Sequence, residues 1–227
     1  MRILIINPNS STKVTNDIKH VISSDTVDFE FYTAPSSAPL EIDNDDTAKI
    51  SESVVLPDLL SGHYLDRFDG FLVGCFSNHP LIQSLKQYTS KPIMGIMQAC
   101  LTYHLVNNHN SIIITSFKSW EPLLDTAIKE FYRTKELPAN IRPTKSFDIN
   151  VSNLNSPEVF GEIVDKTREI IGDDINCVLL GCAGMAGLDE KLSEKFPGVV
   201  FVDSVKIGVE VLVSLVKFDK VVRSQPV

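Results

Sequence analysis

Short apolar runs alternate along the chain with longer amphipathic segments, and this alternation is typical of an α/β protein. Apolar runs without a polar residue indicate strands that are buried on both faces of a parallel sheet. The predicted strands lie at residues 3–6, 27–31, 71–73, 93–96, 112–114, 177–180 and 199–202. Between them, apolar residues that recur every three or four positions predict helices. These lie at residues 14–22, 48–60, from 81 onward, 119–131, 156–171 and from 206 onward. Hydroxyl residues precede two of them, and we expect the segment Ser10-Ser11-Thr12 and Ser119 to act as helix caps.

The two halves of the chain repeat the same order of elements, which indicates an internal duplication. A strand ends in Gly-Cys at Gly74–Cys75 and again at Gly181–Cys182, and the two cysteines are 107 positions apart. Polar loops follow strands at Asn7 and at Thr115, 108 positions apart, and a proline recurs before the next strand with nearly the same offset. The duplication predicts two pseudo-symmetric lobes with parallel sheets and a cleft between them.

Polar and reactive residues follow four of the predicted strands. In open parallel sheets, ligands bind beyond the carboxyl ends of the strands, so these residues are the candidate site. They are Asn7, Asn9 and Ser10; Cys75, Phe76, Ser77 and Asn78; Thr115 and Ser116; and Cys182, Ala183, Gly184 and Met185. If the lobes face each other, Cys75 and Cys182 approach one cleft from opposite sides. Two buried cysteines that only fill strand ends are the alternative, but the matching positions favour a functional pair.

A pair of opposed thiols suits racemisation, in which a proton leaves one face of a carbon and another is added to the opposite face. One cysteine acts as a thiolate base and the other as a thiol acid. The pKa of a free thiol is about 8.5 and falls at a helix N-terminus. Each cysteine precedes a predicted helix, so we expect both thiol pKa values to be lowered. Backbone N–H groups after Cys75 and Cys182, together with Asn and Ser side chains, would stabilise the enolate oxygen.

Composition narrows the possible partners. The 227 residues carry a formal charge of −8 and no lysine- or arginine-rich stretch, which argues against nucleic-acid and anionic-membrane partners. No apolar run approaches the roughly 20 residues of a membrane span, and residues 1–8 do not read as a signal peptide, so we expect a cytoplasmic protein. The four cysteines have no Cys-x-x-Cys spacing, and no phosphate-binding glycine loop is present. We therefore expect neither a metal nor a cofactor.

The sequence resembles the aspartate/glutamate/hydantoin racemases and, within them, the hydantoin and allantoin racemase branch. The resemblance covers nearly the whole chain and rests on four motifs. They are Ile6-Asn7-Pro8-Asn9-Ser10, Cys75-Phe76, Gly95-Ile96 before a polar loop, and Leu180-Gly181-Cys182-Ala183-Gly184-Met185. The resemblance implies two flavodoxin-like lobes, no cofactor, and Cys75 and Cys182 as the catalytic residues. It also implies that the C-terminal helix returns to the first lobe, so that lobe 1 comprises residues 1–99 and 205–227 and lobe 2 residues 100–204.

Two positions depart from the pattern of this branch, and both carry an amide where an acid is usual. Asn78 stands in place of an aspartate and Gln98 in place of a glutamate. An amide keeps an acceptor but loses the negative charge, which should ease thiolate formation, so both changes bear on the substrate. Among the remaining residues, His79 is expected near the surface, and Cys100 and Cys177 are expected to be packed thiols.

The expected function is racemisation of a small cyclic ureide, either allantoin or a 5-substituted hydantoin, whose ring C–H is acidic enough for thiol catalysis. An acidic amino-acid racemase stays open as an alternative, although no clear charged set for an α-carboxylate and an α-ammonium is evident. So does a related isomerase, or a decarboxylase, which needs only one of the two cysteines. The alternative from another class is a non-catalytic ligand-binding protein on the same fold. We also expect a homo-oligomer.

Overall fold

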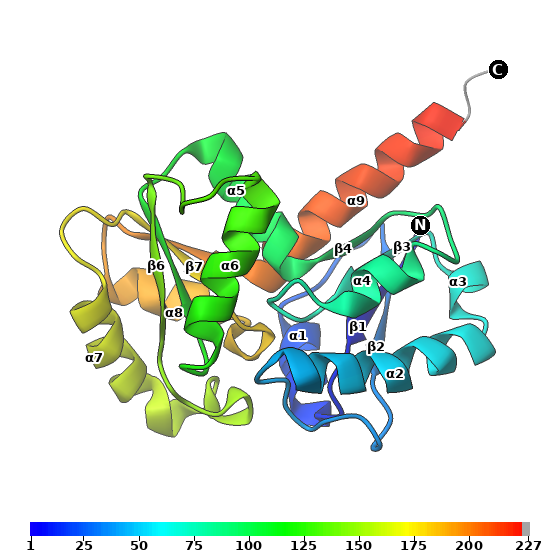
Figure 1. The fold of residues 1–227 in the computed structure, drawn as a ribbon, viewed down its shortest axis with the longest axis horizontal. Helices are drawn as coiled ribbons and strands as arrows, with labels where there is room; N and C mark the ends of the chain where they lie inside the picture. The colour runs from blue at the N-terminus through cyan, green and yellow to red at the C-terminus, as the bar shows by residue number, and fades with distance from the viewer. Residues whose placement is uncertain (224–227) are drawn as a thin grey trace.

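The computed structural model describes residues 1–223 and contains two parallel four-stranded sheets, one in each half of the chain (Figure 1). Lobe 1 has the strand order β2-β1-β3-β4, and its strands are β1 (Arg2–Asn7), β2 (Asp28–Thr33), β3 (Gly70–Val73) and β4 (Ile93–Gly95). Lobe 2 has the order β6-β5-β7-β8, and its strands are β5 (Ser111–Thr115), β6 (Ile141–Ser146), β7 (Cys177–Leu180) and β8 (Val200–Asp203). The same order in both sheets confirms the predicted α/β fold with two pseudo-symmetric lobes.

Helices connect the strands. Those of the first half are α1 (Thr12–His20), α2 (Asp45–Ser61), α3 (Tyr64–Arg67), α4 (Pro80–Leu85) and α5 (Ile96–Asn107). The second half contains α6 (Trp120–Tyr132), α7 (Phe160–Ile170), α8 (Leu188–Lys195), α9 (Ser204–Arg223) and the 3-10 turns η1 (Val151–Asn153), η2 (Pro157–Val159) and η3 (Ala183–Met185). Within residues 1–223, no helix is both long and apolar enough to cross a membrane.

The central strands are buried on both faces because their side chains alternate between two apolar clusters. In β1, Ile3 and Ile5 join one cluster, whereas Leu4 and Ile6 join another. Cys177 of β7 belongs to the same cluster as Ile3 and Ile5, and it is buried as expected. The two lobes are therefore joined by a continuous apolar core.

The C-terminal helix α9 starts directly after β8 of lobe 2 and packs on β3, β4 and α5 (Figure 1). Gly208 permits this close approach, because a Cβ there would lie 3.1 Å from Leu72 Cδ1 and 3.2 Å from Ile96 Cγ2. Near the end of the helix, Lys220 forms an ion pair with Asp69 at 3.1 Å. The expected division between residues 99 and 100 falls inside α5, and the lobe boundaries themselves stay a prediction.

The segment after Gly95 is a helix and not the expected polar loop. Gln98 Oε1 accepts a hydrogen bond from the Gly95 N–H at 3.0 Å, which satisfies a free donor at the start of α5. Six of the helix residues are buried, among them Cys100. The expectation that Cys100 is a packed thiol is therefore confirmed, whereas the expectation of a loop is wrong.

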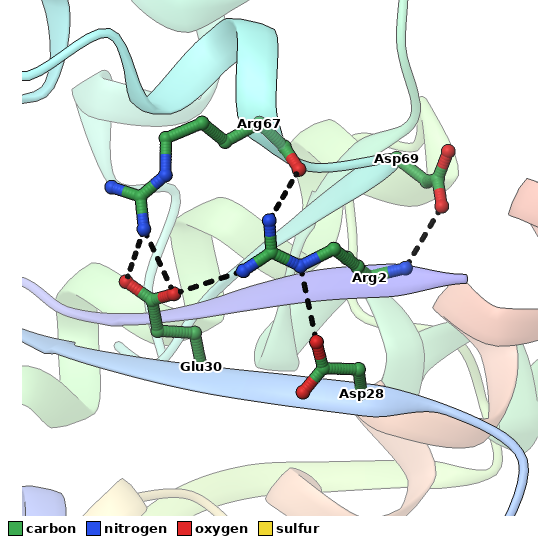
Figure 2. A network of polar contacts seen from close by, with 5 residues as sticks. All are labelled: Arg2, Asp28, Glu30, Arg67 and Asp69. Carbon is green, nitrogen blue, oxygen red and sulfur yellow. Dashed lines mark hydrogen bonds and ion pairs between the residues drawn. The ribbon is translucent and has the colours of Figure 1, made fainter.

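A network of ion pairs connects the starts of the lobe 1 strands (Figure 2). Arg2 donates to Asp28 at 3.0 Å and to Glu30 at 3.4 Å, and Arg67 also donates to Glu30 at 3.1 Å. Asp69 accepts from the Arg2 backbone N–H at 2.8 Å. Exposed ion pairs contribute about 1 kcal/mol or less each to stability. This network therefore fixes the relative positions of the strand starts more than it stabilises the fold. The candidate site lies at the opposite ends of these strands.

Candidate active site

A pocket lies where the carboxyl ends of the central strands of both lobes meet. Of the residues predicted from the strand ends, seven line it: Asn9, Cys75, Phe76, Thr115, Ser116, Cys182 and Ala183. The remaining walls come from Pro8, Val14, Ile42, Gly74, Trp120, Val151 and Gly181. Among the described residues that line the pocket, none carries a charged side chain.

Cys75 follows β3 and lines the pocket from lobe 1. Its Sγ lies 3.3 Å from Ser77 Oγ. Burial raises the pKa of Cys75 to about 12, while the hydrogen bond with Ser77 lowers it and the Cys182 thiol raises it. Cys75 and Cys182 line the same pocket.

Cys182 follows β7, lies just before η3, and lines the pocket from lobe 2. Burial raises the pKa of Cys182 to about 11; the Gly184 backbone N–H and the Ser116 hydroxyl lower it, and the Glu41 carboxylate raises it. Each thiol thus has a serine hydroxyl as its partner, and each serine belongs to the same lobe as its cysteine.

The expected lowering of the thiol pKa values is wrong. A loop follows Cys75, and α4 begins only at Pro80, while Cys182 precedes the three-residue turn η3. Neither thiol therefore stands at the N-terminus of a long helix, where the dipole would favour the thiolate. Burial in a largely apolar pocket decides the direction for both.

The Asn-Pro-Asn segment builds the loop between β1 and α1. The buried Asn7 donates through its amide to Asn9 Oδ1 at 2.9 Å and to Thr15 Oγ1 at 3.0 Å. Asn9 Oδ1 in turn accepts from the Ser11 N–H at 3.0 Å. A cap within Ser10-Ser11-Thr12 is confirmed, and it is Ser11, whose hydroxyl accepts from the Val14 N–H. Asn7 therefore shapes the loop, and the loop presents Pro8 and Asn9 to the pocket.

Six predicted site residues do not line the pocket: Asn7, Ser10, Ser77, Asn78, Gly184 and Met185. Ser77 and Gly184 act on the thiols as described above. The Ser10 hydroxyl donates to a backbone carbonyl of the loop after β2, and Met185 is buried in the core of lobe 2. Asn78 is exposed, and its amide lies 3.5 Å from Glu130 Oε2. Asn78 and Gln98 therefore both lie outside the lining of the pocket.

The sequence prediction missed four larger side chains of the pocket, namely Val14, Ile42, Trp120 and Val151. Trp120 Nε1 donates to the Ile42 carbonyl at 3.2 Å, which links the two lobes at the pocket wall. Trp120 is the one tryptophan of the chain, and that rarity is the single signal that could have marked it. Ile42 lies in a loop and Val151 in the short turn η1, and neither segment carries a recognisable motif.

His79 is buried, and the expectation of a surface position is wrong. It caps α4, with Nδ1 accepting from the Leu81 N–H at 3.3 Å, and Nε2 has no partner within residues 1–223. Burial lowers the pKa of His79 to about 4, so the ring is neutral at pH 7. In the described part of the chain, no group of three or more His, Cys, Asp or Glu side chains is placed to hold a metal ion.

A model of the family described as Asp/Glu/Hydantoin racemase matches residues 3–212. The chain belongs to the Asp/Glu/hydantoin racemase family. Both cysteines and all the pocket walls lie within the matched residues.

Individual proteins are similar to this chain over most of their length. Protein DCG1 of Saccharomyces cerevisiae is 34% identical, with 96% of this chain and 97% of that protein covered. A hydantoin racemase of Pseudomonas sp. (strain NS671) is 25% identical, with 97% of this chain and 88% of that protein covered. The structure of allantoin racemase from Klebsiella pneumoniae is similar in fold, with a TM-score of 0.81 at 21% identity over 96% of this chain and 89% of that one.

Proposed function

We propose that this chain is a cofactor-independent racemase of a neutral cyclic ureide, either allantoin or a 5-substituted hydantoin. One observation carries the proposal: two thiols, one from each lobe, line a single pocket whose described lining residues are all uncharged. The hydantoin and allantoin racemases among the similar proteins support this substrate class.

In the proposed reaction, the thiolate of one cysteine takes the proton from the carbon between the ring carbonyl and a ring nitrogen. The C–H electron pair moves onto the carbonyl, which gives an enolate. The thiol of the other cysteine then donates its proton to the opposite face of that carbon. One cysteine ends as a thiol and the other as a thiolate, so the next turnover runs in the reverse direction. The step needs no redox partner, and we propose that activity persists in the presence of a chelator.

The uncharged lining favours a neutral substrate over an acidic amino acid. A buried carboxylate without a cationic partner costs several kcal/mol, and none of the described residues that line the pocket is cationic. Glu41 already places a negative charge near Cys182, which would repel a substrate carboxylate further. An amino-acid racemase is therefore the weaker candidate.

Single replacement of either thiol tests the assignment. Serine has nearly the size of cysteine but is a far weaker acid, so Cys75→Ser and Cys182→Ser should each lower the racemisation rate by about two orders of magnitude or more. Polarimetry of each enantiomer of allantoin and of a simple alkyl hydantoin measures this loss. Exchange of the substrate C–H for deuterium, followed by NMR in D₂O, should survive with one enantiomer in Cys75→Ser and with the other in Cys182→Ser.

Cys177→Ser is the matched control. Cys177 is a buried thiol that lies outside the pocket and has the Ser111 hydroxyl beside it, so this variant should racemise at the rate of the unmodified protein. Normal racemisation by either Cys75→Ser or Cys182→Ser refutes the two-thiol mechanism. If the unmodified protein turns over neither ureide, the proposed substrate class is wrong.

A further inference from the structure

The loop between β2 and α2 reaches from lobe 1 onto lobe 2 beside the pocket. Residues 41–43 accept hydrogen bonds from three residues of lobe 2. The donors are the N–H and Oγ of Ser152, at 3.4 and 3.2 Å, Trp120 Nε1 at 3.2 Å, and Ser119 Oγ at 2.8 Å. We call this segment the 41–43 clasp. Its first residue, Glu41, is the one that binds through its side chain.

A chain of contacts leads from Glu41 to the Cys182 thiol. Ser152, which donates to Glu41, belongs to η1 and follows Val151. Val151 packs against η3 so closely that a Cβ on Gly184 would lie 2.6 Å from the Val151 carbonyl oxygen. The backbone N–H of Gly184 in turn points at the Cys182 sulfur and favours its thiolate.

We propose that Glu41 is a positioning residue, through which lobe 1 holds the turn of lobe 2 that carries Cys182. The inference rests on the proposed function, in which Cys182 is one of the two acid/base groups. Glu41 acts in two separable ways. Its carboxylate oxygen holds η1 against η3, and its charge raises the pKa of Cys182. The first effect needs only an acceptor, whereas the second needs the negative charge.

Cys182 and the turn η3 that follows it have other ionisable groups nearby, and these groups are the same in every Glu41 variant. The turn packs against α1 and η1, and the residues of η1 are all uncharged at neutral pH. Other ionisable groups on the neighbouring elements include Lys13, Asp17, Lys19 and His20 on α1, Asp43 in the clasp, Asp203 at the end of β8, and Cys75, which lines the same pocket.

Alkylation of Cys182 measures the effect of the charge without requiring catalysis. In a Cys75→Ser background, Cys182 is the one remaining thiol that is only partly buried, since Cys100 and Cys177 are buried. Glu41→Gln keeps a side-chain oxygen for Ser152 but removes the charge. We expect the rate of Cys182 alkylation by iodoacetamide to move to lower pH and to be about threefold higher at pH 8, which corresponds to half a pKa unit.

Glu41→Ala removes the acceptor as well as the charge. Backbone amides of residues 151–153 and 183–185 should then exchange with deuterium about fivefold faster or more, because the hydrogen bonds that hold η1 are lost. In Glu41→Gln these amides should exchange at the rate of the unmodified protein. This contrast separates the hydrogen bonds from the charge.

Glu121→Gln is the matched control. Glu121 Oε1 accepts from the N–H and Oγ of Ser146 in the same pattern, at 3.0 and 2.7 Å, but both residues lie in lobe 2 and outside the pocket lining. The pH dependence of Cys182 alkylation should not change in this variant. An equal shift in Glu121→Gln, no shift in Glu41→Gln, or unchanged exchange in Glu41→Ala would each overturn the inference. A protein that shows the expected shifts but racemises no ureide refutes the proposed function alone.

Discussion

The raised pKa values of Cys75 and Cys182 limit the fraction of molecules in which one of the two cysteines is a thiolate. A hydrogen bond with one serine lowers the pKa of each thiol, but burial raises the pKa by more in both cases. At pH 7 both residues are therefore almost entirely thiols, and the proposed reaction requires that one of them be a thiolate. The fraction of active enzyme is then set by the pH.

We expect the racemisation rate to rise with pH between 7 and 9. Because the pKa is about 12 for Cys75 and about 11 for Cys182, the thiolate fraction should grow about tenfold for each pH unit in this range. Initial rates from polarimetry, measured for both enantiomers and corrected for uncatalysed racemisation, provide the measurement. A rate that is flat, or that has its maximum at or below pH 7, would contradict the assignment.

His79 makes stability depend on pH in a predictable direction. It is 1% exposed, and burial lowers its pKa from 6.5 to about 4. Between these values the unfolded chain binds one proton more than the folded one, so stability is full above pH 6.5 and falls as the pH falls toward 4. The contribution lost between pH 7 and pH 5 is about 2 kcal/mol.

His79→Asn isolates this contribution, because asparagine also caps helices but does not titrate. Urea unfolding at pH 7 and at pH 5 should show a loss of unfolding free energy that is larger in the unmodified protein than in the variant by about 2 kcal/mol. Equal losses in the two proteins would mean that His79 can be protonated in the folded state.

Most of the candidate site could be predicted because its residues follow strands directly. Asn9, Cys75 and Cys182 reach the pocket by their position at strand ends, which the apolar pattern reveals. Glu41 and Val151 could not be predicted, since they belong to a loop and to the short turn η1, whose positions depend on packing between the lobes. The sequence marked Gln98 only as an amide at a position that is usually acidic, and it did not predict that the Gln98 side chain caps α5.

Among the elements, β6 is the strand that the apolar pattern misses. It spans Ile141–Ser146 at the edge of its sheet, and Arg142 and Lys145 are exposed. It also contains Pro143, and proline lacks the N–H that an internal strand needs, so it occurs at sheet edges. Its register against β5 shifts between Ile112 and Ile114. An edge strand with few apolar residues resembles a loop in sequence.

Ser119 forms a hydrogen bond between the lobes in place of the helix-capping bond that its position predicts. It stands at the N-cap position of α6 as expected, but its side chain makes no capping hydrogen bond. Its hydroxyl donates instead to the Asp43 carbonyl in the 41–43 clasp at 2.8 Å. Serine therefore marks the start of the helix correctly, while its hydrogen bond serves the junction between the lobes.

At the scale of the whole molecule, the repeated strand order accounts for the paired thiols, because each lobe contributes the same strand end to one pocket. The lobes are not independent, however. Apolar residues of both lobes form one core cluster, and α9 leaves the sheet of lobe 2 to pack on strands of lobe 1. We therefore expect the two lobes to unfold as one unit.

Gly208→Val tests this coupling. A valine side chain there would press on Leu72 and Ile96, where even a Cβ lies 3.1–3.2 Å from their side chains, so the free energy of unfolding should fall by about 2 kcal/mol. Gly161→Val is the control, since a Cβ at Gly161 meets nothing within 4 Å. If the lobes unfold together, the slowest-exchanging amides of β5 in lobe 2 should lose as much protection as those of β1 in lobe 1, although the substitution touches only α9 and its lobe 1 neighbours. Loss of protection confined to β1 would show that the lobes unfold separately and that α9 does not couple them.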